Sequence, residues 1–459
     1  MTEAKSNPRD IAVWALCDRA GNVSARLARL LTETTGLVPA DRALAGELAL
    51  GACRHKNTLR AVLKAFLAQP DRKLPAPLEQ VLDVGAYQLV FASRVPDFAA
   101  VNEAVQQTVR LNHRRKSGFI NGVLRTVARN LSPVAEGTPP IAANIIPVST
   151  DSYRMALSNI FSDPQAKPAE YLSDAYSLPI WLAARWLERF GSLEEAAKIA
   201  MQANTRAPII LRANSLRSDV QSVLDRLRNG GVGAQPHENR LSIVLTERRH
   251  VPDLPGFDEG LFQVQDPTAT SVAVATGCAA NMNVLDFCAA PGTKTTHMAE
   301  LMGNRGSITA VDVSPARLDL IRRNCRRMGV DIVQTILAEQ AGSLESGSFG
   351  LVLADVPCSN SGVLSRRAEA RWRLGPDAIV KLVHDQKMLA SAAASFVRKG
   401  GRFVYSTCSI EPEENSQVAH WLGRKLPQLK LIDEKLTLPG GAGEPTRWHD
   451  GGYYAIFEA

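Results

Sequence analysis

The chain has 459 residues, of which 45% are hydrophobic and 22% are charged. This is the composition of ordinary globular domains and excludes a largely disordered chain. No uninterrupted run of about 18 apolar residues occurs, which excludes a membrane-spanning helix, and the length suits about three domains.

The opening residues, MTEAKSNPRD, are charged where a signal peptide would be apolar. The cysteines are odd in number, widely spaced and without a C-x-x-C pair, which excludes a disulfide framework and a zinc site of that type. They are Cys17, Cys53, Cys278, Cys288, Cys325, Cys358 and Cys408. The eight histidines show no ligand spacing either. We therefore expect a reduced, cytoplasmic protein without a metal ion.

The net charge of +7 is concentrated at the N-terminal end. Residues 1–130 contain 19 Lys/Arg and 11 Asp/Glu, whereas the remainder contains 34 and 35. Such asymmetry favours a polyanionic partner, nucleic acid first, for the N-terminal domain. The alternative is a basic, solvated surface with no partner.

Residues 1–131 are predicted to form an all-α domain, because apolar residues recur at helical spacing throughout. Basic residues gather at 54–56 and at 113–116, and clusters of this kind can bind phosphates. Several short motifs resemble those of the NusB-type RNA-binding domain. They are Asp41-Arg42, Gly51-Ala52-Cys53-Arg54, Gly85-Ala86-Tyr87-Gln88-Leu89, Val101-Asn102-Glu103-Ala104-Val105 and Asn121-Gly122-Val123-Leu124-Arg125.

Two shorter segments follow. Residues 132–168 are rich in proline and are predicted to be a linker with at most short helices. Residues 169–256 alternate helical and strand patterns and are predicted to be a small α+β, RNA-binding subdomain. Its Trp181, Arg212 and Asn214 could face a substrate, although a structural role is favoured for each.

Residues 257–459 are predicted to form an α/β Rossmann-like domain, because strands alternate with helices. Strands are expected at 284–287, 307–311, 332–337, 350–354 and 402–406. Ligands bind such sheets beyond the carboxyl ends of the strands, so the residues that follow each strand are the candidate site.

The residues that follow the expected strands indicate which ligand the domain binds. The first strand leads into a loop of small residues that opens a helix, which suits close approach of a ligand and a carboxylate at the helix N-terminus. Asp312 ends the second strand, where an acidic group can bind ribose hydroxyls. Neither G-x-G-x-x-G nor a P-loop occurs at the first loop, which argues against pyrophosphate ligands. S-adenosylmethionine, with a ribose and a carboxylate, is the expected cofactor.

Two thiols beside a methyl donor indicate methylation of cytosine carbon-5. That carbon is a poor nucleophile until a thiolate adds at carbon-6. A base must then remove the carbon-5 proton, and an acidic group could bind the edge of the ring. Cys358 follows the fourth strand and Cys408 the fifth. The spacing does not decide which of them attacks.

The motifs of residues 170–459 resemble those of the Sun-type family of RNA cytosine-5 methyltransferases. They are Cys288–Lys294, Asp355–Val363, Arg371-Trp372-Arg373 and Thr407-Cys408-Ser409. The resemblance implies a class I methyltransferase domain, with Cys408 as the nucleophile and Cys358 as the thiol that assists proton elimination. It places Lys294 and Asp355 close to the reacting ring. It also implies a cofactor site made of Cys288, Ala289, Ala290, Pro291, Gly292, Thr293, Lys294, Asp312, Glu339 and Asp355.

Three positions depart from that family's pattern. Thr293 replaces a common glycine, Glu339 replaces a usual aspartate, and Gly451-Gly452 contains one extra glycine. Neither thiol is lost, so we expect an active, monomeric enzyme that acts on 16S ribosomal RNA. The alternatives are the same chemistry on transfer RNA and a non-catalytic RNA-binding factor in ribosome assembly.

Overall fold

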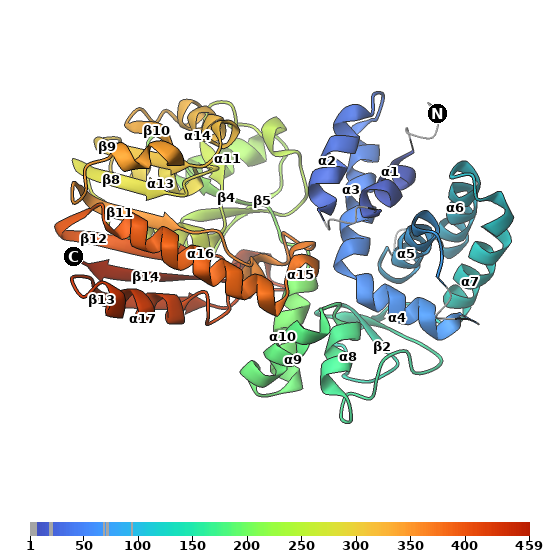
Figure 1. The fold of residues 1–459 in the computed structure, drawn as a ribbon. Coiled ribbons are helices and arrows are strands. Elements are labelled where there is room, and N and C mark those ends of the chain that lie inside the picture. Colours follow the sequence, from blue (N-terminus) through green and yellow to red (C-terminus); the bar gives the residue numbers. More distant parts are fainter. Residues whose placement is uncertain (1–6, 18–21, 68, 70–72, 93–94) are drawn as a thin grey trace. The chain divides into compact units, whose positions relative to one another are not determined.

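The computed structural model describes residues 7–17, 22–67, 69, 73–92 and 95–459 (Figure 1). The chain forms two compact units. The first contains the chain up to Thr205 together with Arg367–Gly375, and the second contains Arg206–Arg366 and Pro376–Ala459. The segment predicted as one α+β subdomain, 169–256, is therefore divided between the two units.

The N-terminal part of the first unit is helical, as predicted. Its helices are α1 (Pro8–Leu16), α2 (Val23–Glu33), α3 (Pro39–Arg54), α4 (Lys56–Phe66), α5 (Ala76–Phe91), α6 (Asp97–Arg110), the 3-10 helix η1 (Arg114–Lys116) and α7 (Ser117–Arg129). Helix α5 is buried along most of its length. Two glycines of the expected motifs allow close helix packing, because a Cβ at Gly51 would meet the Tyr87 ring at 2.2 Å and one at Gly85 would meet Leu124 at 2.6 Å.

The basic cluster at residues 54–56 is not a phosphate-binding surface. Arg54 and His55 are buried. His55 stacks on Phe91 with 3.8 Å between ring centroids, and burial lowers the pKa of His55 well below its usual value. These basic side chains are buried because the end of α3 packs inside the unit. Residue type alone does not reveal that burial.

The proline-rich segment 132–168 contains a small antiparallel sheet, where at most short helices were expected. Its strands, β1 (Ala135–Glu136), β2 (Ile145–Ser149) and β3 (Ser152–Met155), lie in the order β1-β3-β2. Pro147 is tolerated because β2 is an edge strand, where a missing N–H need not break a ladder. Helices α8 (Pro168–Ala175), α9 (Ile180–Phe190) and α10 (Leu193–Asn204) complete this part of the chain.

Residues 367–375, which include the short helix α15 (Ala370–Arg373), are anchored by two side chains within the first unit. The fully buried Arg371 guanidinium donates to the carbonyl oxygens of Ser177 and Ala203 at 3.0 and 2.8 Å. It also donates to Asn204 Oδ1 at 2.7 Å and to the Arg54 carbonyl at 3.3 Å. Trp372 Nε1 donates to the Cys53 carbonyl at 2.8 Å, and Lys56 lies 4.9 Å from the Trp372 ring centroid.

The second unit begins with a four-stranded antiparallel sheet in the order β5-β6-β4-β7. Its elements are β4 (Ile210–Ala213), α11 (Val220–Asn229), β5 (Ala234–Pro236), β6 (Ser242–Leu245), the 3-10 helix η2 (Val251–Asp253) and β7 (Phe262–Val264). Two of the residues that could have faced a substrate are structural here. Arg212 is buried in an ion pair with Glu300, and Asn214 Nδ2 donates to the Gly260 and Met328 carbonyls at 2.8 Å.

The predicted α/β domain is a seven-stranded sheet in the order β10-β9-β8-β11-β12-β14-β13. The first five of these strands are parallel, and β14 pairs antiparallel with both of its neighbours, β12 and β13. Its strands are β8 (Met282–Phe287), β9 (Gly306–Asp312), β10 (Val333–Leu337), β11 (Phe349–Asp355), β12 (Val397–Thr407), β13 (Lys430–Thr437) and β14 (Gly452–Glu458). The connecting elements are α12 (Pro267–Ala275), α13 (Thr293–Leu301), α14 (Pro315–Met328), η3 (Ala338–Ser343), η4 (Ser361–Val363), α16 (Pro376–Ala394), α17 (Ser416–Lys425) and η5 (Pro445–Arg447).

Helices cover both faces of this sheet, so alternate strand residues enter two different cores (Figure 1). Phe403 and Tyr405 pack in the core that contains residues of α16 and α17, whereas Val404 packs in the core that contains residues of α12, α13 and α14. The strands read as continuous apolar runs because both faces are buried. Strand β13 was not predicted, since it lies at the edge and is mostly exposed.

We expect Arg371→Met to lower the free energy of unfolding of the first unit by about 3 kcal/mol or more, because it leaves several buried acceptors without a donor. Arg373→Met, in the same short helix but at an exposed position, should change it by less than about 0.5 kcal/mol. Urea denaturation followed by circular dichroism measures both. Equal effects of the two substitutions would contradict the anchoring role of Arg371.

Candidate active site

The carboxyl ends of the parallel strands lie at one edge of the sheet and bring the predicted residues together. Phe287 at the end of β8 pairs with Ala354, and Asp355 at the end of β11 pairs with Ser406 of β12. On the other side, Asp312 at the end of β9 pairs with Leu337 of β10. The loops that follow these five neighbouring strands therefore lie at the same edge of the sheet.

Two thiols lie in contact at this edge. The sulfur atoms of Cys358 and Cys408 are 3.0 Å apart, and both cysteines are free. Asn360 holds the pair from one side. Its Oδ1 accepts from Cys408 Sγ at 3.3 Å, and its Nδ2 donates to the Cys358 carbonyl at 2.9 Å.

The two thiols are not equivalent. The hydrogen bond with Cys408, followed by burial, raises the pKa of Cys358 well above the usual value of a cysteine. The charges of Cys408 and Glu414 act in the same direction. The raised pKa favours the protonated form of Cys358, and either sulfur can be the donor in the contact between them.

A lysine and an aspartate form an ion pair next to the thiols. Lys294, from the first turn of α13, lies 2.5 Å from Asp355 Oδ2. The other carboxylate oxygen accepts from Ser406 Oγ at 2.6 Å. Burial lowers the pKa of Lys294, but Asp355 and, more weakly, Cys408 outweigh this effect, so its pKa lies above the usual value. Lys294 thus stays charged within the electrostatic range of Cys408.

The loop of small residues between β8 and α13 turns tightly. Cys288 has a positive φ of 79°, and Gly292 has a φ of 90° and precedes the first residue of α13. A Cβ at Gly292 would meet Ile321 at 3.2 Å, so a larger residue would crowd α14. Burial, followed by the charges of Asp355, Asp286 and Asp312, raises the pKa of Cys288 to about 12. Cys288 is therefore a neutral thiol and no nucleophile.

The acidic residues of the site differ in their surroundings. Asp312 is buried, accepts from the Ala290 N–H at 3.0 Å and lies 3.3 Å from Arg317 Nε. Asp286 accepts from Thr295 Oγ1 at 2.6 Å, and burial raises its pKa to about 7. Glu339 follows β10 in η3 and is exposed, without an ion pair to any part of the chain that the structure describes.

These residues fit S-adenosylmethionine. The positively charged sulfur of that molecule suits a site with three neighbouring carboxylates, and the buried Asp286 Oδ1 has no hydrogen-bond partner among the described residues. Asp312 ends β9 where a ribose-binding group is expected. The backbone of residues 288–294, with the amino end of α13, suits the carboxylate and the close approach of the ligand.

Sequence reasoning missed the residues that hold the thiol loops in place. The buried Glu414 carboxylate accepts from the N–H of Ser359 at 2.8 Å and from Gln386 Nε2 at 2.9 Å. It also accepts from the hydroxyls of Ser359 and Ser409. Glu414 thus joins the loop of Cys358 to the loop of Cys408. Its position in the turn Glu411–Asn415 was visible in the sequence, but a charged turn residue is usually exposed.

The extra glycine near the C-terminus lies behind the thiol pair. Gly451 N–H donates to the Gly362 carbonyl at 2.8 Å, and Gly362 N–H donates to the Cys408 carbonyl at 3.1 Å. A Cβ at Gly451 would meet the Gly362 Cα at 2.9 Å, and one at Gly362 would meet the Cys408 carbonyl oxygen at 2.8 Å. Because neither glycine has a side chain, the backbone segments that contain Gly362, Cys408 and Gly451 can pack directly against one another.

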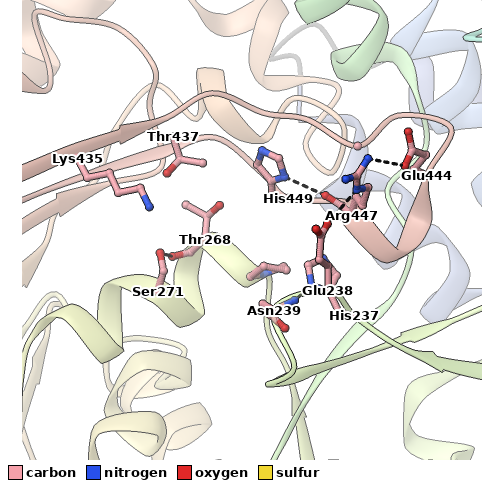
Figure 2. A pocket seen from close by; sticks show the side chains of 12 residues that line it. His237, Glu238, Asn239, Thr268, Ser271, Lys435, Thr437, Glu444, Arg447 and His449 are labelled. Carbon is pink, nitrogen blue, oxygen red and sulfur yellow. Dashed lines mark hydrogen bonds and ion pairs between the residues drawn. The ribbon is translucent and has the colours of Figure 1, made fainter.

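A separate polar pocket of about 590 Å³ lies in the second unit (Figure 2). Arg447 pairs with Glu238 at 2.9 Å and with Glu444 at 3.2 Å, which neutralises its charge. Lys435 lies on the opposite side of the pocket. None of the sequence-predicted site residues lines this pocket.

Among the described residues, no helix is long and apolar enough to cross a membrane. Across the same ranges, no group of three or more histidine, cysteine, aspartate or glutamate side chains could hold a metal ion.

Comparison with known proteins gives matches along most of the chain. Residues 6–129 match the NusB family, residues 178–252 the ferredoxin-like domain of RsmF/B-like methyltransferases, and residues 276–446 the family described as 16S rRNA methyltransferase RsmB/F. A methyltransferase homologue protein from Pyrococcus horikoshii has a similar solved structure, with a TM-score of 0.54 and 28% identity over 63% of this chain and 98% of the other.

Two curated relatives extend over nearly the whole chain. The probable ribosomal RNA small subunit methyltransferase B of Bacillus subtilis is 31% identical, over 91% of this chain and 88% of the relative. The ribosomal RNA small subunit methyltransferase B of Pseudomonas syringae pv. tomato is 30% identical, over 98% and 96%. The expected methyltransferase fold and NusB-like domain are confirmed, and the cofactor is S-adenosylmethionine. The chain belongs to the family of ribosomal RNA small subunit methyltransferases B.

Proposed function

We propose that this methyltransferase modifies carbon-5 of a cytosine in 16S ribosomal RNA through a covalent bond between Cys408 and carbon-6. The observation that carries the proposal is the contact of 3.0 Å between the Cys358 and Cys408 sulfur atoms beside the Lys294–Asp355 ion pair. The choice of 16S ribosomal RNA rests on the names of the family and of its curated relatives.

Cys408 is the better candidate for the attacking thiolate. The hydrogen bond with Cys408 and burial raise the pKa of Cys358, which makes Cys358 the poorer candidate for the attacking thiolate. The Lys294 ammonium lies close enough to interact electrostatically with Cys408. The nucleophilic form of a cysteine is the thiolate, so a thiol that keeps its proton is the poorer attacker.

The residues then act in sequence. The Cys408 sulfur bonds to carbon-6, and the electron pair of the carbon-5–carbon-6 double bond makes carbon-5 nucleophilic. S-adenosylmethionine, when bound, supplies an electrophilic methyl group. Asp355 and Lys294 lie where they can hydrogen-bond to the polar edge of the ring and orient it.

Cys358 is suited to the elimination step because its surroundings change during the reaction. Once the Cys408 sulfur is bonded to carbon-6, the largest cause of the raised Cys358 pKa is removed. Cys358, which is only partly buried, can then lose its proton to solvent, and the resulting thiolate accepts the proton from carbon-5. The electron pair of that C–H bond restores the double bond, and Cys408 leaves as a thiolate.

The substrate is tested by incubating the purified enzyme and labelled S-adenosylmethionine with transcripts of 16S ribosomal RNA and of transfer RNA. We expect label in the ribosomal transcript, at a cytosine that resists bisulfite conversion. Methylation of transfer RNA alone would contradict the proposed substrate, and methylation at a position that bisulfite converts would contradict the proposed atom.

The thiol roles are tested by two single substitutions. Cys408→Ala should abolish methyl transfer, because no bond to carbon-6 can form. Cys358→Ala should accumulate a protein–RNA adduct that survives denaturation, because the adduct forms and the proton then remains on carbon-5. Denaturing gel electrophoresis with labelled RNA measures the adduct. An adduct with Cys408→Ala, and none with Cys358→Ala, would reverse the assignment.

Glu414 is predicted to be a positioning residue. Glu414→Ala should lower kcat about 100-fold, since it frees both thiol loops and small misplacements of reacting groups cost about that much. Cofactor binding, measured by calorimetry, should be unchanged, and Glu414→Gln should restore part of the rate because an amide oxygen can still accept from Ser359 N–H. Loss of cofactor binding in Glu414→Ala would indicate a general structural defect instead.

A further inference from the structure

We propose that the groove between α6 and α7 in the helical domain binds a single-stranded segment of the substrate RNA. The groove has a volume of about 410 Å³ and is lined by Asp97, Phe98, Val101, Asn102, Val105, Asn121, Arg125, Ala128 and Arg129. This inference rests on the proposed function, because it takes RNA as the substrate.

The first observation is an exposed aromatic ring. Phe98 is 79% exposed, whereas Ala100, Val101 and Ala104 of the same helix are buried. A phenylalanine with this exposure gains nothing from the hydrophobic core. It offers a flat face on which an unpaired base can stack, and such stacking does not depend on sequence.

The second observation is a pair of arginines on the facing helix. Arg125 and Arg129 are exposed and lie one helical turn apart on α7, so that both line the groove. Neither forms an ion pair with any carboxylate of the described residues. Like charges at this spacing repel each other, and a bound anion would remove the repulsion. Two cations beside an aromatic face suit a phosphate backbone whose base stacks on the ring.

The remaining polar residues agree with this ligand. Asn102 and Asn121 line the groove and can donate to and accept from base edges. Asp97 is the one acidic residue of the lining. It lies in the first turn of α6, where a negative charge is favourable, and it interacts electrostatically with Arg154.

Double-stranded RNA does not fit these features as well. A base can stack on Phe98 only if it is not already stacked within a helix, and proteins read double-stranded RNA mainly through its backbone. The arginines alone would suit either form. The combination with an exposed phenylalanine favours an unpaired segment that flanks the target.

The experiment measures binding of the full chain to a short, unstructured RNA oligonucleotide with a fluorescent end label, over a range of salt concentrations. Phe98→Ala should weaken binding about 5- to 100-fold without changing its salt dependence, and Phe98→Tyr should restore it. Arg125→Gln and Arg129→Gln should each reduce the slope of log K against log salt by about 0.7. The matched duplex should show only the arginine effects.

Two control variants lie elsewhere in the same unit. Leu157 is 78% exposed, so Leu157→Ala matches the loss of exposed apolar surface, and Arg29→Gln removes an exposed arginine that pairs with Glu33. Neither should change RNA binding. Point substitutions are preferred to deletion of residues 1–131, because that deletion would also remove the carbonyl groups of Cys53 and Arg54 that bind Trp372 and Arg371.

The outcomes separate this inference from the proposed function. If the wild-type chain binds and methylates RNA while Phe98→Ala and both arginine variants bind as the wild type does, the groove inference alone is overturned. If the wild-type chain neither binds nor methylates RNA, both are overturned. If the variants lose binding to another protein and keep their affinity for RNA, the groove is a protein-docking surface and the inference is overturned.

Discussion

The structure of this enzyme depends on the pairing of two parallel strands, β11 and β12. Their register places Asp355 opposite Ser406, so the loops that follow the two strands leave the sheet side by side. Cys358 and Cys408, fifty residues apart in the chain, therefore meet at 3.0 Å. Each thiol alone would be an ordinary half-buried cysteine. Together they form a pair in which the hydrogen bond with Cys408 raises the pKa of Cys358.

Three groups of residues surround the thiol pair. Lys294 and Asp355 provide charge next to the thiols, and the loop 288–294 with Asp312 provides a site that fits the cofactor. Glu414 accepts hydrogen bonds from both thiol loops and so joins them. In the proposed mechanism the same sheet edge supplies attacking, orienting and supporting groups, which is the arrangement that catalysis by positioning requires.

We propose that the first unit contributes affinity for RNA and takes no part in the chemistry. Its basic residues differ in availability: those at 54–56 are buried or stacked, whereas Arg125 and Arg129 line an open groove with Phe98. A segment of the chain that follows the catalytic loops, 367–375, is anchored within this unit by Arg371. The unit therefore has a structural role in addition to the proposed binding of RNA.

The sequence alone determined the helical N-terminal domain, the five parallel strands and the small-residue loop, because these depend on local periodicity and on residue type. It also located both thiols at strand ends. Four features could not be predicted from local sequence patterns and were decided by tertiary structure. They are the contact between the sulfur atoms, the burial of Arg54, the edge position of Pro147 and the role of Glu414. These features depend on which segments distant in the chain pack together, and burial reverses the usual preference of a charged residue for water.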